Sequence, residues 1–199
     1  MIAVVDYGGG NIGSVLKATE HLGHPAERVA RPELLRQAEK IILPGQGHFG
    51  AMMAALSERG ILEALREALA AGTPFLGICL GLEALYEASD EAPDVPGLGF
   101  LPGRVRRFKG IFKVPHVGWS QLQRARESRI LQGVEPGSFV YFCHSYFGPV
   151  TEESVGLTEY GECFAAAAEM KNIFAVQFHP EKSGEVGLRV LKNFLEDRG

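Results

Sequence analysis

Short apolar runs alternate with amphipathic stretches over the first half of the chain. Buried strands are predicted at 2–7 (IAVVDY), 40–44 and 74–78, with a weaker strand at 26–30. Apolar residues at helical spacing predict helices over 12–22, ended by Gly23, and over 49–58 and 61–70. Strands that alternate with helices are typical of βαβ units, so we expect a parallel sheet with helices on both faces.

The pattern changes after about residue 90. Glycine and proline interrupt the stretch 97–119, which predicts short antiparallel strands and turns. Further strands are predicted at 138–146 (SFVYFCHSY) and 173–178, and an amphipathic helix at 184–197. No repeat or low-complexity linker divides the sequence, so we expect residues 1–199 to form a single domain.

Composition limits the class of protein. The chain has 199 residues, 46% of them hydrophobic, which suits one domain with a substantial core. A net charge of −4 does not support binding to nucleic acid. No apolar run reaches the roughly 18 residues of a membrane-spanning helix, and the first residues do not resemble a signal peptide. Three widely spaced cysteines form neither a disulfide framework nor a CxxC metal site, so we expect a cytoplasmic protein.

A candidate nucleophile lies where the strand at 74–78 meets the next helix. Gly77-Ile78-Cys79-Leu80-Gly81 is the cysteine form of the nucleophile elbow. The N–H groups at the start of the following helix should lower the pKa of Cys79, and the Leu80 N–H should face an oxyanion. The alternative is a buried core cysteine, a common state of free cysteines. The glycines on both sides favour the nucleophile.

Two further segments complete this hypothesis. His179 ends the strand at 173–178, and Glu181, two residues on, is placed to orient its imidazole, as a catalytic base requires. A lone histidine is more often structural, but this context favours catalysis. The turn formed by Gly45, Gln46 and Gly47 could direct the Gln46 N–H at the oxyanion; a plain β-turn explains its glycines equally well.

Together these motifs resemble class I (triad-type) glutamine amidotransferases. DYGGGN at 6–11, PGQGHFG at 44–50, PHVGW at 115–119, YFCHSY at 141–146 and QFHPEKSG at 177–184 are similar to the glutaminase subunits of imidazole glycerol phosphate synthase. The resemblance implies a three-layer α/β fold with a mostly parallel mixed sheet, flanking helices and a flavodoxin-like core. It also implies that glutamine is hydrolysed to glutamate and ammonia through a cysteine thioester.

The resemblance implies a partner as well. Family members form a heterodimer with a (β/α)₈-barrel cyclase, which uses the ammonia to make imidazole glycerol phosphate and aminoimidazole carboxamide ribotide in histidine biosynthesis. Neither a cofactor nor a metal is expected. We also expect the isolated chain to be nearly inactive, because a loop at 45–47 that is not flipped leaves the oxyanion unsupported.

The resemblance assigns roles to five more residues. Glu83 stands where the family often has Gln, and is placed to bind the amino group of glutamine or to favour the helix N-terminus. Glu91 matches a substrate contact, with a solvated loop carboxylate as the alternative. Asn11, His144 and Lys182 match positions at the cyclase interface. Gln46 replaces a common Val, which a backbone donor tolerates.

Three other functions remain open. A glutaminase for a different synthase, such as that of anthranilate or pyridoxal phosphate, would share the chemistry but not PHVGW and YFCHSY. Stress proteins with a cysteine elbow share the layered fold but lack the late HPE segment. A non-catalytic subunit would have lost Cys79 or His179, and the chain has both.

Overall fold

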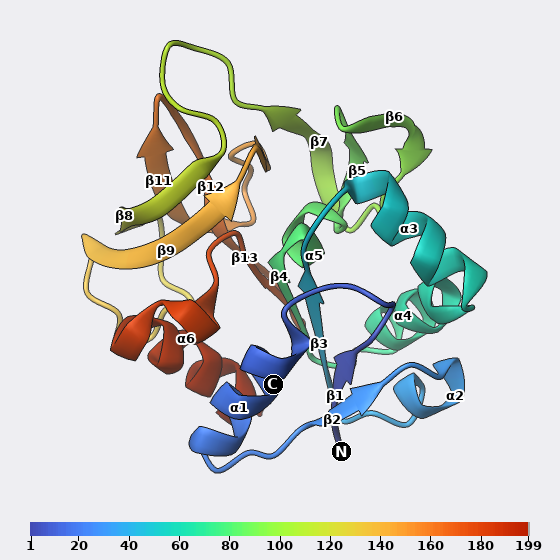
Figure 1. Ribbon diagram of the computed structural model, residues 1–199. Helices are drawn as coiled ribbons and strands as arrows, with labels where there is room; N and C mark the ends of the chain where they lie inside the picture. The colour runs from blue at the N-terminus through green and yellow to red at the C-terminus, as the bar shows by residue number, and fades with distance from the viewer. Residues whose placement is uncertain (199) are drawn as a thin grey trace.

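A nine-stranded mixed sheet runs through the computed structural model, which describes residues 1–198 (Figure 1). Its strands lie in the order β2-β1-β3-β4-β13-β12-β11-β8-β9. Their bounds are β1 Ile2–Val5, β2 Glu27–Val29, β3 Lys40–Gly45, β4 Phe75–Cys79, β8 His116–Arg124, β9 Ser138–His144, β11 Ser154–Tyr160, β12 Glu162–Met170 and β13 Ile173–Val176. The five strands from β2 to β13 pair in parallel, and the pairs from β13 to β9 are antiparallel.

Helices cover both faces of the parallel half (Figure 1). Their bounds are α1 Ile12–His21, α2 Pro32–Leu35, α3 Phe49–Glu58, α4 Ile61–Ala70, α5 Leu80–Glu83 and α6 Gly184–Glu196, with a short 3₁₀ helix at Pro180–Lys182. Successive residues of a strand point to opposite faces, so Val4 of β1 packs with α1 and α6, whereas Ala3 and Val5 pack with α3 and α4. This burial on both faces explains the continuous apolar runs in the sequence.

A second, four-stranded sheet lies beside the first in the order β10-β7-β5-β6. Its strands are β5 Tyr86–Ser89, β6 Ala92–Pro96, β7 Leu101–Arg107 and β10 Tyr146–Phe147. The α/β fold with a mixed sheet and flanking helices is therefore confirmed, with its parallel pairing concentrated in one half of the large sheet.

The predicted helices at 49–58 and 61–70 are confirmed at both ends, and the other predicted elements lie within a few residues of their expected bounds. The prediction of one strand over 138–146 is wrong. The chain bends at Ser145, where His144 Nδ1 donates to the Tyr146 carbonyl oxygen at 2.7 Å. As a result β9 pairs with β8 in the large sheet, and β10 pairs with β7 in the small one.

Candidate active site

Three neighbouring strands bring the candidate catalytic segments together at their carboxyl ends. Gly45, the last residue of β3, lies opposite Cys79, the last residue of β4. On the other side Val176 of β13 lies opposite Ile78, so His179 follows only three residues after this pairing. The carboxyl ends of parallel strands are where ligand sites of open α/β sheets form. The pairing of the strands therefore supports the site predicted from the motifs.

Cys79 occupies the strained turn that the elbow motif predicts. Its φ of 55° and ψ of −110° are rarely adopted by a non-glycine residue. A Cβ on Gly77 would lie 2.5 Å from the Gly81 carbonyl oxygen, and a Cβ on Gly81 would overlap the Leu43 carbonyl oxygen. Glycine is needed at both positions because the backbone of the turn packs tightly against Gly77 and the backbone of β3 packs tightly against Gly81.

The electrostatics of Cys79 differ from the expectation. Burial raises the pKa of the Cys79 thiol well above its ordinary value, the nearby carboxyl of Glu83 raises it further, and the Leu80 N–H only partly offsets these effects. Helix α5 is four residues long, which is too short for a substantial macrodipole. The thiol is therefore protonated in this state, and its Sγ points to the Cys143 carbonyl oxygen at 3.9 Å.

A histidine–carboxylate pair supplies a base. His179 Nδ1 lies 2.9 Å from Glu181 Oε1, and both side chains are almost fully buried. Burial raises the pKa of Glu181, but hydrogen bonds from His179 and Asn11 outweigh it and hold the pKa below its ordinary value. A carboxylate can only accept, so Nδ1 carries a proton, and in the neutral imidazole the lone pair is then on Nε2. Nε2 is buried without a hydrogen-bond partner among the described residues, as a base awaiting a proton would be.

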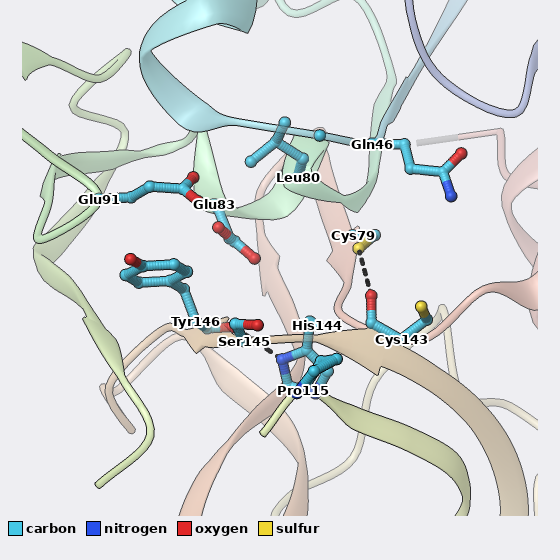
Figure 2. A pocket seen from close by; sticks show the side chains of 11 residues that line it. Gln46, Cys79, Leu80, Glu83, Glu91, Pro115, Cys143, His144, Ser145 and Tyr146 are labelled. Carbon is cyan, nitrogen blue, oxygen red and sulfur yellow. Dashed lines mark hydrogen bonds between the residues drawn. The ribbon is translucent and has the colours of Figure 1, made fainter. Parts of the chain in front are cut away.

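A cavity of about 220 Å³ opens beside Cys79 (Figure 2). The residues that line it come from the loop after β3, the elbow and its helix α5, the loop before β6, the residue before β8, and the chain from the end of β9 to the start of β10: Gln46, Gly47, Cys79, Leu80, Glu83, Glu91, Pro115, Cys143, His144, Ser145 and Tyr146. Figure 2 shows the carboxyl groups of Glu83 and Glu91 turned toward this space. The lining has two acidic groups and no lysine or arginine, which suits a ligand that carries an ammonium group.

Glu83 is a buried carboxyl group with one strong partner. Gln177 Nε2 donates to Glu83 Oε1 at 3.0 Å and lies 3.9 Å from Cys79 Sγ. Burial raises the pKa of Glu83 to about 8, against the opposing effect of the Gln177 hydrogen bond. Glu91 is less buried, and its Oε2 accepts the Phe49 N–H at the start of α3 at 2.6 Å. Glu91 therefore has a structural role in addition to lining the cavity.

The expected oxyanion loop points elsewhere in this state. The Gln46 N–H donates to the hydroxyl of Tyr7, with the nitrogen 3.2 Å from Oη. Gly47 has a φ of 105°, and a Cβ on it would meet no atom within 4 Å. Of the two N–H groups expected at the oxyanion, only that of Leu80 faces the Cys79 sulfur.

The three expected interface residues lie in different surroundings. Lys182 is exposed, as an interface residue should be, whereas Asn11 is half-buried and its Nδ2 donates to Glu181 Oε1 at 3.0 Å. His144 is 5% exposed, lines the cavity and bonds to His116 at 3.1 Å between Nε2 and Nδ1. His144 is therefore turned inward to the cavity in this chain, and its expected role at the interface stays a prediction.

Other residues at the site were not predicted. Tyr7 and Gln177 contact the predicted groups, and their place within the DYGGGN and QFHPE segments was the only available signal. On the opposite side of β8 and β9, Val117, Trp119 and Phe139 are each more than half exposed, an unusual grouping of large apolar side chains. No helix within residues 1–198 is long and apolar enough to cross a membrane.

Comparisons with known proteins agree with this geometry. A family model described as glutamine amidotransferase class-I matches residues 3–197. Two curated relatives are each named imidazole glycerol phosphate synthase subunit HisH. The protein from Moorella thermoacetica is 47% identical, covering 98% of this chain and 94% of its own length. The protein from Methanothermobacter thermautotrophicus is 48% identical, covering 98% of each chain.

Solved structures share the fold at lower identity. A crystal structure of a glutamine amidotransferase superposes with a TM-score of 0.77 at 22% identity, covering 98% of this chain and 97% of the other. The structure of PurLQS from Thermotoga maritima has a TM-score of 0.74 at 21% identity, covering 98% and 96%. At this level of identity the structures bear on the fold alone.

Proposed function

The chain belongs to the class I glutamine amidotransferase family, and from this premise we propose that it is the glutaminase subunit of an imidazole glycerol phosphate synthase. It hydrolyses glutamine to glutamate and ammonia, and a (β/α)₈-barrel cyclase subunit uses the ammonia in histidine biosynthesis. The observations that carry this proposal are the strained Cys79 elbow at the end of β4 and the buried His179–Glu181 pair that follows the neighbouring strand β13. We also propose that the chain acts as one domain, in the cytoplasm.

Catalysis begins with a protonated thiol. His179 Nε2 takes the proton from Cys79 Sγ, and the sulfur attacks the side-chain amide carbon of glutamine. The carbon–nitrogen bond then breaks, and His179 returns the proton to the leaving ammonia. Water next attacks the thioester and gives its proton to His179, after which the thiol leaves and glutamate is released. Glu181 holds the imidazole in the required tautomer throughout, as the orienting acid of a triad does.

The cavity supports the binding of glutamine next to this nucleophile. Glu91 is placed to attract its ammonium group, and the protonated carboxyl of Glu83 is placed to accept a hydrogen bond from it. The N–H groups of Leu80 and Gln46 would bind the oxyanion once the Gln46 peptide turns toward Cys79. Gly45 and Gly47 permit that turn. In this state the site holds substrate-binding groups but lacks the second oxyanion donor.

We place the cyclase on the exposed apolar face of β8 and β9. Val117, Trp119 and Phe139 form this face, and the same β9 ends at the cavity through Cys143 and His144. The carbonyl oxygen of Tyr141, also on β9, accepts the His179 N–H at 2.9 Å. A barrel docked here would therefore lie next to the source of ammonia and against the strand that supports the base. Lys182, exposed beside the catalytic pair, is placed to extend this interface.

The test is replacement of Cys79 by Ala in the complex with the cyclase. Synthesis from glutamine should be lost, whereas synthesis from added ammonium salts should continue, because only the supply of ammonia is broken. Cys163→Ala is the matched control, since Cys163 is an exposed cysteine on β12 away from the cavity. A Cys79→Ala complex that still used glutamine at the normal rate would refute the assignment of the nucleophile.

A further inference from the structure

Tyr7 binds the Gln46 peptide, whose N–H is the expected second donor to the oxyanion. Its hydroxyl oxygen accepts the Gln46 N–H, and the side chain of Gln46 itself is exposed. Tyr7 is 5% exposed, and Gly9 lies so close that a Cβ there would be 2.8 Å from Cε2 of the ring and 3.2 Å from the hydroxyl oxygen. The hydroxyl is therefore fixed by its surroundings, and the loose partner in this hydrogen bond is the loop.

We propose that Tyr7 is a positioning residue that latches the Gln46 peptide away from the oxyanion and thereby keeps the isolated chain slow. This inference rests on the proposed function, because it assigns a role only if glutamine is attacked at Cys79. It adds a specific residue that sets how strongly turnover depends on the bound cyclase.

The loop can move between two orientations because its ends differ in freedom. Gly45 is held against the elbow, where a Cβ would lie 2.6 Å from the Leu80 Cβ, so its α-carbon stays beside Cys79. Gly47, in contrast, has open space where a side chain would be. Glycine at both positions permits the backbone rotation that turns the intervening N–H. The hydrogen bond to Tyr7 is then the main interaction that must break before the N–H can turn toward the oxyanion.

Tyr7 belongs to a loop that also supports the catalytic base His179. Tyr7 and Asn11 lie on one loop between β1 and α1, and Asn11 donates to Glu181. Asp6 anchors the start of this loop, because its Oδ1 accepts the Gly8 N–H at 2.9 Å and its Oδ2 accepts Arg28 Nε at 2.6 Å. Since Gly8 is exposed, a bound partner can contact this loop. A shift of the loop would then act on both Tyr7, which holds the Gln46 peptide, and Asn11, which holds Glu181.

The test is Tyr7→Phe, which removes the hydroxyl and keeps the ring. A neutral hydrogen bond of ordinary strength shifts a two-state equilibrium by about 2- to 10-fold, so kcat of glutamine hydrolysis by the isolated chain should rise by about that factor. KM should stay unchanged, because the oxyanion donor stabilises the transition state and not bound glutamine. The complex, whose loop the cyclase has already turned, should change little. The ratio of complexed to isolated turnover should therefore fall.

Two controls separate the possible failures. Tyr160→Phe removes another tyrosine hydroxyl, which donates to the Lys113 carbonyl oxygen away from the cavity, and should leave kcat unchanged. Tyr7→Phe combined with Cys79→Ala should have no glutaminase activity. If activity survives in this double variant, the proposed function fails. If activity is lost there but Tyr7→Phe alone leaves kcat unchanged or lowers it, only the latch is wrong.

A measurement on the unaltered chain covers the case in which Tyr7→Phe does not fold. The latched Gln46 amide should exchange its hydrogen more slowly than the amide of Gly47 in the isolated chain. Binding of the cyclase should change the chemical shift of the Gln46 amide as it leaves the Tyr7 hydroxyl. An exchange rate as fast as that of Gly47, with no change of shift in the complex, would overturn the proposal.

Discussion

The buried carboxyl of Glu83 should make the stability of this chain depend on pH. Glu83 is 3% exposed, and its pKa in the folded protein is about 8, compared with an ordinary value of 4.5. Between these values the unfolded chain loses the proton and the folded chain keeps it. The folded state then binds more protons, so stability is full below pH 4.5 and is lost as the pH rises toward 8. Glu83→Gln removes the titrating group and keeps an oxygen to accept from Gln177 Nε2.

The size of the effect follows from the two pKa values. Each pH unit between them costs about 1.4 kcal/mol. Relative to the wild type, Glu83→Gln should therefore gain about 2 kcal/mol in the free energy of unfolding at pH 6 and about 4 kcal/mol at pH 8. The gain should fall to zero about one pH unit below 4.5, where both states of the wild type hold the proton.

Urea unfolding at pH 5, 6, 7 and 8, followed by circular dichroism, measures this difference. Glu58→Gln is the control, because it changes an exposed carboxyl at the end of α3 and should follow the wild-type profile. A constant difference between Glu83→Gln and the wild type across these pH values would refute the reasoning. It would mean that the Glu83 carboxyl reaches water in the folded chain.

Two further predictions concern packing and docking. Gly81→Ala should lower the free energy of unfolding by about 3 kcal/mol, because the added methyl overlaps the Leu43 carbonyl. Gly13→Ala in α1, where the methyl meets nothing within 4 Å, should raise the free energy of unfolding by about 1 kcal/mol. Urea unfolding measures both variants, and equal effects would contradict the packing argument. Trp119→Ala should weaken binding of the cyclase about 30-fold, as loss of an interface tryptophan does. Val150→Ala changes a similarly exposed apolar residue outside the β8–β9 face and should leave the affinity for the cyclase unchanged. Calorimetric titration measures both affinities, and equal losses would place the cyclase elsewhere.

The parallel half of the fold could be predicted because its strands and helices have clear and different periods. Strand β12 had no such signal. It lies between β11 and β13 with both faces covered, and its run of four alanines, 165–168, shows no alternation. β5 and β6 are short, and their pairing shifts register, so neither has a regular pattern. The bend at Ser145 depends on the inward turn of His144, which the aromatic sequence around it does not show.

In the candidate site, too, features with a local cause could be predicted from the sequence, and features that depend on tertiary contacts could not. Cys79 and its glycines could be found because one turn imposes a fixed spacing. The pKa of Cys79 could not, since it depends on burial in the folded chain and on the nearby carboxyl of Glu83. The burial of His144 could not be predicted for the same reason. Which side of β9 faces the cavity is decided by pairing with β8.

The resting electrostatics explain why a local base is required at this cysteine. A cysteine in water would ionise more fully as the pH rises above about 8. Here Glu83 ionises first, at a pKa of about 8, and its negative charge raises the pKa of Cys79 further. Alkaline solution therefore supplies the thiolate less readily here than it would for a cysteine in water. We expect the proton to pass to His179 Nε2, because Nδ1 on the opposite side of the ring is bonded to Glu181, which Asn11 holds in place. Since Tyr7 lies on the same loop as Asn11, movement of that loop alters the base and the oxyanion donor together.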